Sequence, residues 1–215
     1  RVVLLHHNDA DGLTSAAVLS RTFERAGFDV ERACLEKPYP AVLERIFERD
    51  GALIVLTDFA GRIAPLISEL NRGRNLVLIL DHHKAEAATD TRVHVLDPEL
   101  FGLRGDRDIT ASVTCLVFAR TWDAANADLG AIAVIGAVGD RFFVDGCLVG
   151  ANRDLALRLQ EAGLLEIEGR EHGERYLLNT PNGAIAVDDV ARDLDTLGGA
   201  GYAAGGPETA IDGLL

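Results

Sequence analysis

The sequence predicts an α/β fold, with a parallel sheet covered by helices on both faces and followed by a mainly helical segment. Two observations support the sheet. Short, continuous apolar runs recur through the first half of the 215-residue chain, and stretches with apolar residues at helical spacing separate them. Strands that are buried on both faces read as unbroken apolar runs, and parallel neighbours need a long crossover, usually a helix.

Four apolar runs are the predicted strands, and three amphipathic stretches are the predicted crossover helices. The strands fall at 2–5, 53–56, 76–80 and, more weakly, 93–96. The helices fall at 13–26, at 42–49 and at 63–70, where Gly73 follows as a natural stop. Crossover connections of this kind are right-handed almost without exception.

The second half is predicted to be mainly helical up to about residue 178. Apolar spacing predicts helices at 110–124 and 152–162. Between them, Asp128 can cap a nearly all-apolar segment that ends at Gly139; its length favours a buried helix over a strand. From Asn179 onwards, turn residues and a glycine-rich run predict loops or a linker. The acids between Asp188 and Asp195 are interpreted as a solvated face.

The composition is that of a soluble globular protein. Hydrophobic residues make up 48% of the chain, too many for disorder, and no apolar run reaches the roughly 20 residues of a membrane span. The formal net charge of −13 argues mildly against shape-blind binding to nucleic acid, but it is compatible with a carboxylate metal site. Three scattered cysteines show no disulfide or zinc spacing and no activating neighbour, which predicts a cytoplasmic location.

Acidic residues follow three of the predicted strands. Asp9 and Asp11 come after the run at 2–5, Asp58 comes after 53–56, and Asp81 follows 76–80 directly. The carboxyl ends of parallel strands share one edge of a sheet, where open α/β folds place their sites. Each acid alone is most simply a helix N-cap, because each precedes a helix. Four acids that converge with histidines are better explained by a functional site.

Four of the six histidines form adjacent pairs at the same predicted edge, His6-His7 and His82-His83. Mixed imidazole and carboxylate ligands suit divalent transition ions such as Mn²⁺, whereas Mg²⁺ prefers oxygen alone. Several acids can also bridge two ions about 3.5–4 Å apart, the spacing of two-metal phosphoryl transfer. The isolated His94 and His172 are interpreted as ordinary side chains.

These residues carry a family resemblance. Four ordered segments resemble the motifs of the DHH phosphoesterase superfamily: His7-Asn8-Asp9-Ala10-Asp11-Gly12, the lone Asp58, Asp81-His82-His83 and Gly139-Asp140. The histidine two residues before the first aspartate is closest to the RecJ-like and archaeal branch. The resemblance implies a Rossmann-like DHH catalytic domain, placed at 1–178. Residues 179–215 would then lead toward a C-terminal substrate-binding domain that this sequence does not contain.

The resemblance also implies a role for each residue. Two manganese ions, with magnesium as an alternative, would be held by His7, Asp9, Asp11, Asp58, His82 and Asp140. Of these, Asp58 would bridge the ions, His7 and Asp9 would hold one, and the remaining three would hold the other. Asp81 would orient a histidine, and His83 would bind the scissile phosphate or assist the leaving group. Arg141 would neutralise phosphate charge or form a surface ion pair, and His6 would support the site.

The predicted function is phosphodiester hydrolysis by a manganese-dependent, RecJ-like enzyme that acts on single-stranded nucleic acid or short oligonucleotides. Small nucleotides, such as cyclic dinucleotides or phosphoadenosine phosphate, are the alternative within the same class. A non-catalytic replication or scaffold protein is the alternative from another class. No membrane partner is expected. The polarity of digestion, the choice of DNA or RNA and the oligomeric state are left open by the sequence.

Overall fold

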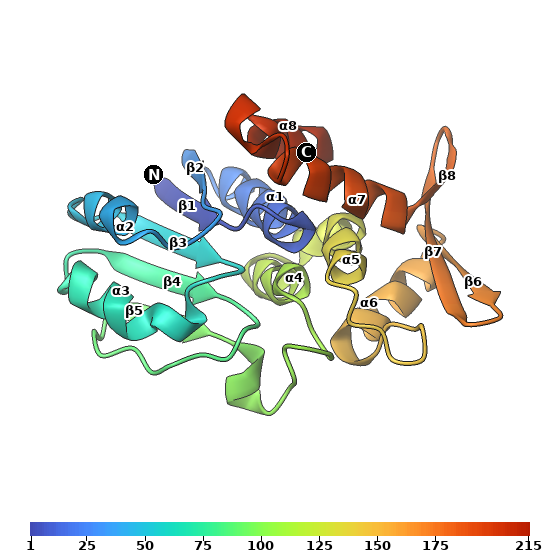
Figure 1. The fold of residues 1–215 in the computed structure, drawn as a ribbon, viewed down its shortest axis with the longest axis horizontal. Helices are drawn as coiled ribbons and strands as arrows, with labels where there is room; N and C mark the ends of the chain where they lie inside the picture. Colours follow the sequence, from blue (N-terminus) through green and yellow to red (C-terminus); the bar gives the residue numbers. More distant parts are fainter.

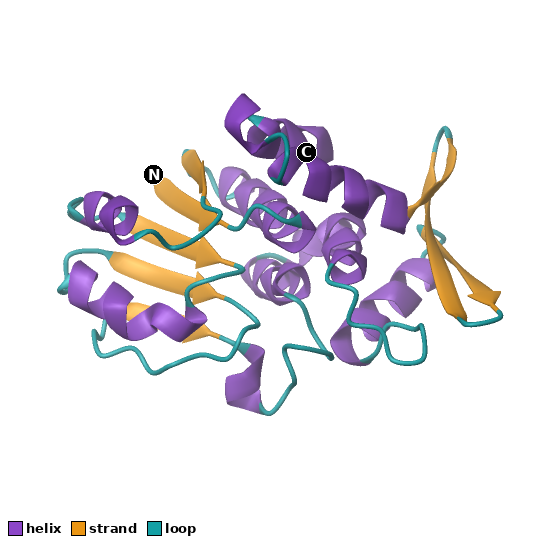
Figure 2. Ribbon diagram, viewed as in Figure 1, coloured by secondary structure: helices purple, strands orange, loops and turns teal.

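The computed structural model describes residues 1–215 and contains a five-stranded and a three-stranded sheet (Figures 1 and 2). The larger sheet is entirely parallel, with the strand order β2-β1-β3-β4-β5. Its strands are β1 (Val2–His6), β2 (Val30–Cys34), β3 (Leu53–Thr57), β4 (Leu76–Leu80) and β5 (Val93–Leu96). His6 pairs with Thr57, which pairs with Leu80, so three central strands end together at one edge. The predicted parallel sheet is confirmed.

Helices cover both faces of the parallel sheet, as predicted. Side chains alternate between the faces of a strand, so one set of core residues packs with α1 (Ala10–Arg25) and α4 (Ala111–Trp122). The other set packs with α2 (Pro40–Phe47) and α3 (Ala64–Asn71). The first α-helix begins three residues before the predicted 13–26, because the Asp9 side chain caps it by accepting the Gly12 N–H.

One strand of the large sheet has no counterpart in the sequence prediction. β2 reads Val-Glu-Arg-Ala-Cys, and all five of its residues are half-buried. It lies at the edge of the sheet, next to β1. Edge strands tolerate charged side chains because one side faces solvent, so no apolar run marks this strand.

The helices predicted at 110–124 and 152–162 correspond to α4 and α6 (Gly150–Glu161). The apolar segment between them forms α5 (Gly130–Gly139), which is a helix, as its length favoured. Asp128, however, does not cap α5. It belongs to a short 3₁₀ segment (Ala124–Leu129) and binds Arg25 at 2.7 Å.

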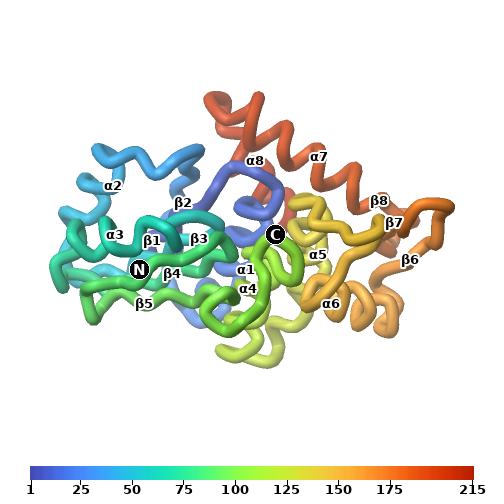
Figure 3. The backbone as a smooth tube through the Cα atoms, turned by 60° about the horizontal axis from the view of Figure 1, so that its bottom comes forward, coloured from blue at the N-terminus to red at the C-terminus, as the bar shows by residue number.

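The prediction of loops or a linker from Asn179 onwards is wrong. An antiparallel sheet of β6 (Leu165–Arg170), β7 (Gly173–Thr180) and β8 (Gly183–Ala186) leads into α7 (Val187–Gly198) and α8 (Gly206–Leu214). Both helices lie against α1, and α7 also packs on α5 (Figure 3). They bury Val187, Ala191, Leu194, Ala210 and Ile211 in the larger core. The acids between these apolar residues masked the helical stripe.

No helix of the chain has both the length and the apolar character of a membrane span.

Leu194→Ala tests whether α7 belongs to the folded core. Leu194 is 5% exposed and packs in the same core as α1 and α5. We expect the substitution to lower the free energy of unfolding by about 2–5 kcal/mol, because it removes buried methyl groups and leaves a cavity. Denaturant unfolding measures the change, with Val117→Ala, which is 50% exposed, as the control. An unchanged midpoint for Leu194→Ala would show that α7 does not stabilise the core.

Candidate metal centre

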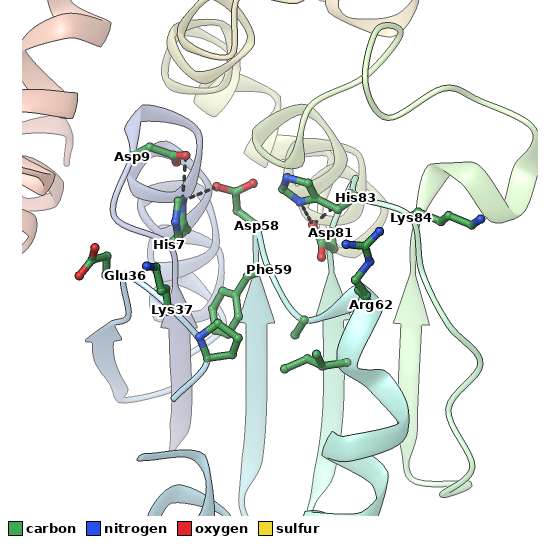
Figure 4. A pocket seen from close by; sticks show the side chains of 13 residues that line it. His7, Asp9, Glu36, Lys37, Asp58, Phe59, Arg62, Asp81, His83 and Lys84 are labelled. Atoms are coloured by element: carbon green, nitrogen blue, oxygen red, sulfur yellow. Dashed lines mark hydrogen bonds and ion pairs between the residues drawn. The ribbon is translucent and has the colours of Figure 1, made fainter. Parts of the chain in front are cut away.

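The predicted site residues meet at the carboxyl edge of the parallel sheet. The loop after β1 supplies His7 and Asp9, and the first turn of α1 supplies Asp11. Asp58 follows β3, whereas Asp81, His82 and His83 follow β4. Asp140 follows α5 and joins them from the helical half of the chain. Figure 4 shows several of these side chains around one cavity.

One group of possible metal ligands consists of His7, Asp9 and Asp58. His7 Nδ1 lies 2.8 Å from Asp9 Oδ2 and 3.6 Å from Asp58 Oδ2 (Figure 4). Asp9 uses its other oxygen to accept the Gly12 N–H at 2.9 Å. The helix-cap interpretation and the ligand interpretation therefore both apply to Asp9, with one carboxylate oxygen for each role.

A second group consists of Asp11, His82 and Asp140. His82 Nδ1 lies 2.7 Å from the Gly105 carbonyl oxygen, so this nitrogen donates and Nε2 faces the acids. His82 Nε2 lies 3.5 Å from Asp140 Oδ2 and 3.9 Å from Asp11 Oδ2. A backbone acceptor on the far nitrogen is the usual way to orient a metal-binding imidazole.

Asp58, a member of the first group, also faces the histidine of the second group. Its Oδ2 faces His7, and its Oδ1 lies 3.3 Å from His82 Nε2. The residue is buried and has a φ of 62°, a left-handed backbone conformation that few non-glycine residues adopt. Strain of this kind is found at functional sites, where the surrounding structure enforces it. The turn directs the carboxylate across the edge of the sheet, toward both histidines.

The electrostatics of the cluster fit a bound cation. The buried Oδ2 atoms of Asp58 and Asp140 have no hydrogen-bond partner. Burial, with the charges of Asp9 and Asp11, raises the pKa of Asp58 to about 7, and burial with Asp11 and Asp58 raises the pKa of Asp140 well above its usual range. Burial alone would lower the pKa of His7, yet Asp58 and Asp9 raise it to about 10. The cluster therefore retains protons, and a divalent cation compensates the same excess of negative charge.

Asp81 orients His83 in the structure. Its Oδ1 accepts from His83 Nδ1 at 2.8 Å and from the His82 N–H at 2.8 Å, and its Oδ2 accepts the Gly61 N–H at 2.8 Å. Asp81 and His83 also form a third group of possible metal ligands with Asp58 and His82. Both oxygens of Asp81 already accept N–H groups, however, which favours a positioning role over a ligand role. His83 is 59% exposed at its side chain and lines the cavity.

Three glycines allow the close packing of this edge, and the sequence analysis did not single them out. A Cβ at Gly136 of α5 would overlap Thr14 Oγ1 and crowd Asp11 Oδ1, and a Cβ at Gly105 would overlap the His82 carbonyl oxygen. Asp11 is also fixed by α4, since its two oxygens accept the N–H groups of Ala111 and Ser112 at 2.7 and 3.0 Å. A Cβ at Gly198 would overlap the Asn8 carbonyl oxygen.

Helix α7 holds the loop that carries His7 and Asp9. Asp195 Oδ1 accepts the Ala10 N–H at 2.8 Å, and the Asn8 side chain donates to the Gly198 carbonyl oxygen at 3.0 Å. The interpretation of all the acids from Asp188 to Asp195 as a solvated face is therefore wrong for Asp195, which is half-buried. Sequence spacing gives no signal of a contact between residues 185 positions apart.

A cavity of about 430 Å³ opens beside the first group, lined by His7, Asp9, Asp58, Asp81 and His83 among others (Figure 4). Arg141 does not line it; it lies at a separate cavity with His172 and Arg192. The His6 ring is buried, its Nδ1 lies 2.8 Å from the His7 carbonyl oxygen, and burial lowers its pKa to about 4. Its role in supporting the site stays a prediction. Cavity residues that the sequence analysis missed include Glu36, Lys37, Phe59, Arg62 and Lys84.

The comparison with protein families identifies one match. The DHH family, N-terminal domain, matches residues 1–134. An uncharacterized protein of Methanocaldococcus jannaschii is 27% identical over 167 residues, which are 76% of this chain and 38% of that protein.

Solved structures show the same fold at lower identity. RecJ from Thermus thermophilus in complex with Mn²⁺ has a TM-score of 0.65 at 21% identity, covering 100% of this chain and 32% of RecJ. A second structure, of exonuclease RecJ bound to manganese, has a TM-score of 0.61 at 18% identity, covering 100% of this chain and 60% of the other. The chain thus spans about a third of the Thermus protein, and the likeness supports the fold.

The substitution Asp140→Ala tests whether Asp140 is a metal ligand or a structural residue at the end of α5. The substitution removes one of several crowded, buried acids, so the metal-free protein should melt at the same or a higher temperature. Its manganese affinity should fall at least tenfold. Thermal unfolding in a chelator and calorimetric titration with Mn²⁺ measure the two effects, with the exposed Asp154→Ala as the control. A marked loss of metal-free stability would mean that Asp140 is a structural residue.

Asp195→Ala tests the contact between α7 and the first loop. Loss of the acceptor for the Ala10 N–H should loosen the loop and weaken manganese binding about tenfold, whereas Asp195→Asn keeps an acceptor oxygen and should restore most of it. Calorimetry with Mn²⁺ measures both variants, and circular dichroism reports their folding. Equal affinity in all three proteins would show that the contact does not position the loop.

Proposed function

The chain belongs to the DHH family, and on this premise we propose that it is a metal-dependent phosphoesterase that hydrolyses phosphodiester bonds with two divalent ions. One observation carries the proposal. Asp58 is buried among the possible metal ligands, and its two oxygens face different histidines, Oδ2 toward His7 and Oδ1 toward His82. A carboxylate in that position can bridge two cations, as in two-metal phosphoryl transfer.

Six residues would hold the ions. His7 and Asp9 would hold one, Asp11, His82 and Asp140 would hold the other, and Asp58 would contact both. Bound divalent ions supply positive charge for a phosphate and lower the pKa of bound water. Manganese is the proposed metal, with magnesium as an alternative, because two imidazoles join the carboxylates. RecJ structures hold Mn²⁺ or Mg²⁺, which supports a divalent metal and leaves the choice to the ligand chemistry.

His83 is the proposed catalytic residue that faces the phosphate. Its Nδ1–H donates to Asp81, which leaves Nε2 free at the exposed side of the ring. This hydrogen bond raises the pKa of His83 above its ordinary value, so the protonated ring is favoured. Nε2–H can donate to a phosphate oxygen or to the leaving group, and Asp81 fixes the ring in that orientation. Arg141, which lies outside the cavity, receives no catalytic role in this proposal.

The proposed substrates are single-stranded nucleic acid or short oligonucleotides, as for a RecJ-like enzyme. Small nucleotides are the second candidate, and the moderate cavity beside the first group favours them. A non-catalytic role is not favoured, because every expected ligand position is filled. Two expectations stay predictions: that the protein is cytoplasmic, and that residues 179–215 lead toward a further domain.

The two adjacent histidines should respond differently to substitution. His82→Ala should lower manganese affinity, because Nε2 faces three acids. His83→Ala should keep the metal but lower turnover about 10²–10⁴-fold, because it removes a proton donor. Elemental analysis and hydrolysis of bis-p-nitrophenyl phosphate with Mn²⁺ measure the two effects, and the exposed His94→Ala is the control.

Two results would contradict this division of roles. Equal loss of metal in both variants would place His83 among the ligands. Full turnover in His83→Ala, with normal metal content, would remove it from the reaction. If the wild-type protein binds manganese but hydrolyses neither this probe nor a dinucleotide, the phosphoesterase proposal itself fails.

A further inference from the structure

A second cavity lies at the amino end of the parallel sheet, at the opposite end from the candidate metal centre. Its volume is about 490 Å³, within the range of small-ligand sites, roughly 300–1,000 Å³. Leu53 and Leu76, which begin β3 and β4, lie in its lining, and the arrows of these strands in Figure 1 point away from this end. The possible metal ligands follow the other ends of the same strands, and none of them lines this cavity.

The floor of the cavity is a part of the sheet that α1 and α4 do not cover completely. Leu76 and Leu78 of β4 lie on one face of the sheet, because side chains two residues apart in a strand point the same way. Leu78 pairs with His94 of β5, and Arg92 comes two residues before His94, on the same face. Leu76 is 43% exposed. Apolar surface that stays open inside a cavity is typical of a ligand site.

Four aromatic side chains form one wall of the cavity. Phe23 comes from α1 and Phe28 from the turn after it, whereas Phe118 and Trp122 come from the C-terminal half of α4. The Trp122 ring lies 5.8 Å from the Phe23 ring and 6.3 Å from the Phe28 ring, at 81° to both. It lies 5.9 Å from Phe118, and yet Trp122 is 48% exposed. Aromatic rings favour such edge-to-face contacts, so the exposed part of this wall can accept one more ring.

Arg92 places a positive charge at the border of this apolar cavity. It is the only Lys, Arg, Asp or Glu residue of the lining. Its Nε donates to the Asn75 carbonyl oxygen at 3.3 Å, and its two terminal nitrogens donate to no group of the protein. The side chain of Asp90, two residues away, accepts instead from the Asn71 side chain at 2.8 Å. In a chain with a formal net charge of −13, a guanidinium that no acid neutralises attracts an anion, and its planar fork fits a carboxylate.

We propose that this cavity binds a small aromatic carboxylate. The ring would lie over Leu76 and Leu78, against the aromatic wall, and the carboxylate would pair with Arg92 and accept a further hydrogen bond from the His94 ring. A free small molecule is the proposed occupant because the volume suits one such ligand, whereas a stable protein interface needs a much larger surface. The inference does not depend on the proposed hydrolysis.

The chain carries its own reporter for this site. Trp122 is the only tryptophan, so two-dimensional NMR spectra of the nitrogen-labelled chain contain one indole N–H signal, and it comes from the cavity wall. The probe is unlabelled indole-3-propionate, and its neutral amide and octanoate are the comparisons. Titration should shift the Trp122 signal with a Kd of about 1 mM or tighter, the affinity expected for a ligand of this size. The amide should bind about tenfold more weakly, because it loses the charge-assisted pair, and octanoate about threefold, because it has no ring.

Substitutions separate the two parts of this recognition. Arg92→Ala should abolish the preference for the acid over the amide, and Arg92→Lys, which keeps the charge without the fork, should retain part of it. Phe28→Leu keeps an apolar side chain but removes a ring, so it should reduce the preference for indole-3-propionate over octanoate. Arg45→Ala, exposed on α2 and outside the lining, is the control. The remaining NMR signals show whether each variant is folded.

Three results would overturn the proposal. The first is an unchanged Trp122 signal at about 10 mM probe, ten times the expected Kd. The second is equal binding of the acid and the amide, or a preference that survives Arg92→Ala, since the ligand would then not be a carboxylate held by Arg92. The third is a Trp122 signal that moves with protein concentration before any probe is added, because a second copy of the chain would then occupy the cavity. None of these measurements involves hydrolysis, so the proposed function stands or fails separately.

Discussion

The repulsion between carboxylates buried at one edge of the sheet is the constraint on which this site depends. Asp11 and Asp58 are buried, and Asp140 is mostly so. Together with burial, Asp11 raises the pKa of Asp58, and Asp11 and Asp58 raise the pKa of Asp140. Several buried acids are unfavourable unless hydrogen-bond donors, protons or cations compensate them. Backbone N–H groups satisfy Asp11, whereas Asp58 and Asp140 each keep an oxygen without a partner. Asp11 is thus held by backbone donors, whereas Asp58 and Asp140 face the His7 and His82 rings and keep an oxygen that a bound cation could use.

The parallel sheet brings the acids of the site close together, and the surrounding helices hold these acids in position. In-register strands end together, so the residues after β1, β3 and β4 are neighbours. The N-terminus of α4 then holds Asp11, and the end of α5 brings Asp140 to His82. Because side chains longer than glycine at positions 105 and 136 would overlap these contacts, the ligand geometry depends on residues with no chemistry of their own.

The sequence predicted the parts of the molecule that follow local rules. Unbroken apolar runs predicted the central strands, and the acids and histidines that follow those runs predicted the candidate metal centre. β2 was not predicted, because the charged Glu31 and Arg32, which are typical of an edge strand, interrupt its apolar residues. The stripe of α7 was concealed by acids, although Val187, Ala191 and Leu194 are spaced for one helix face. Lys37 and Lys84 are the only lysines of the chain, but that both line one cavity depends on topology and could not be predicted from the sequence.

The contact of α7 with the first loop links the site to the most distant part of the chain. Asp195 accepts the backbone N–H of Ala10, and the Gly198 carbonyl oxygen accepts from the Asn8 side chain, so both neighbours of Asp9 are held by α7. Asp9 in turn faces His7. Displacement of α7 would therefore change the position of one ligand group, whereas Asp11, His82 and Asp140 are held by α4, α5 and Gly105. The two groups thus rest on different supports, and Asp58 joins them from the rigid centre of the sheet. Any element that moved α7 would act first on His7 and Asp9, which line the cavity beside the candidate metal centre.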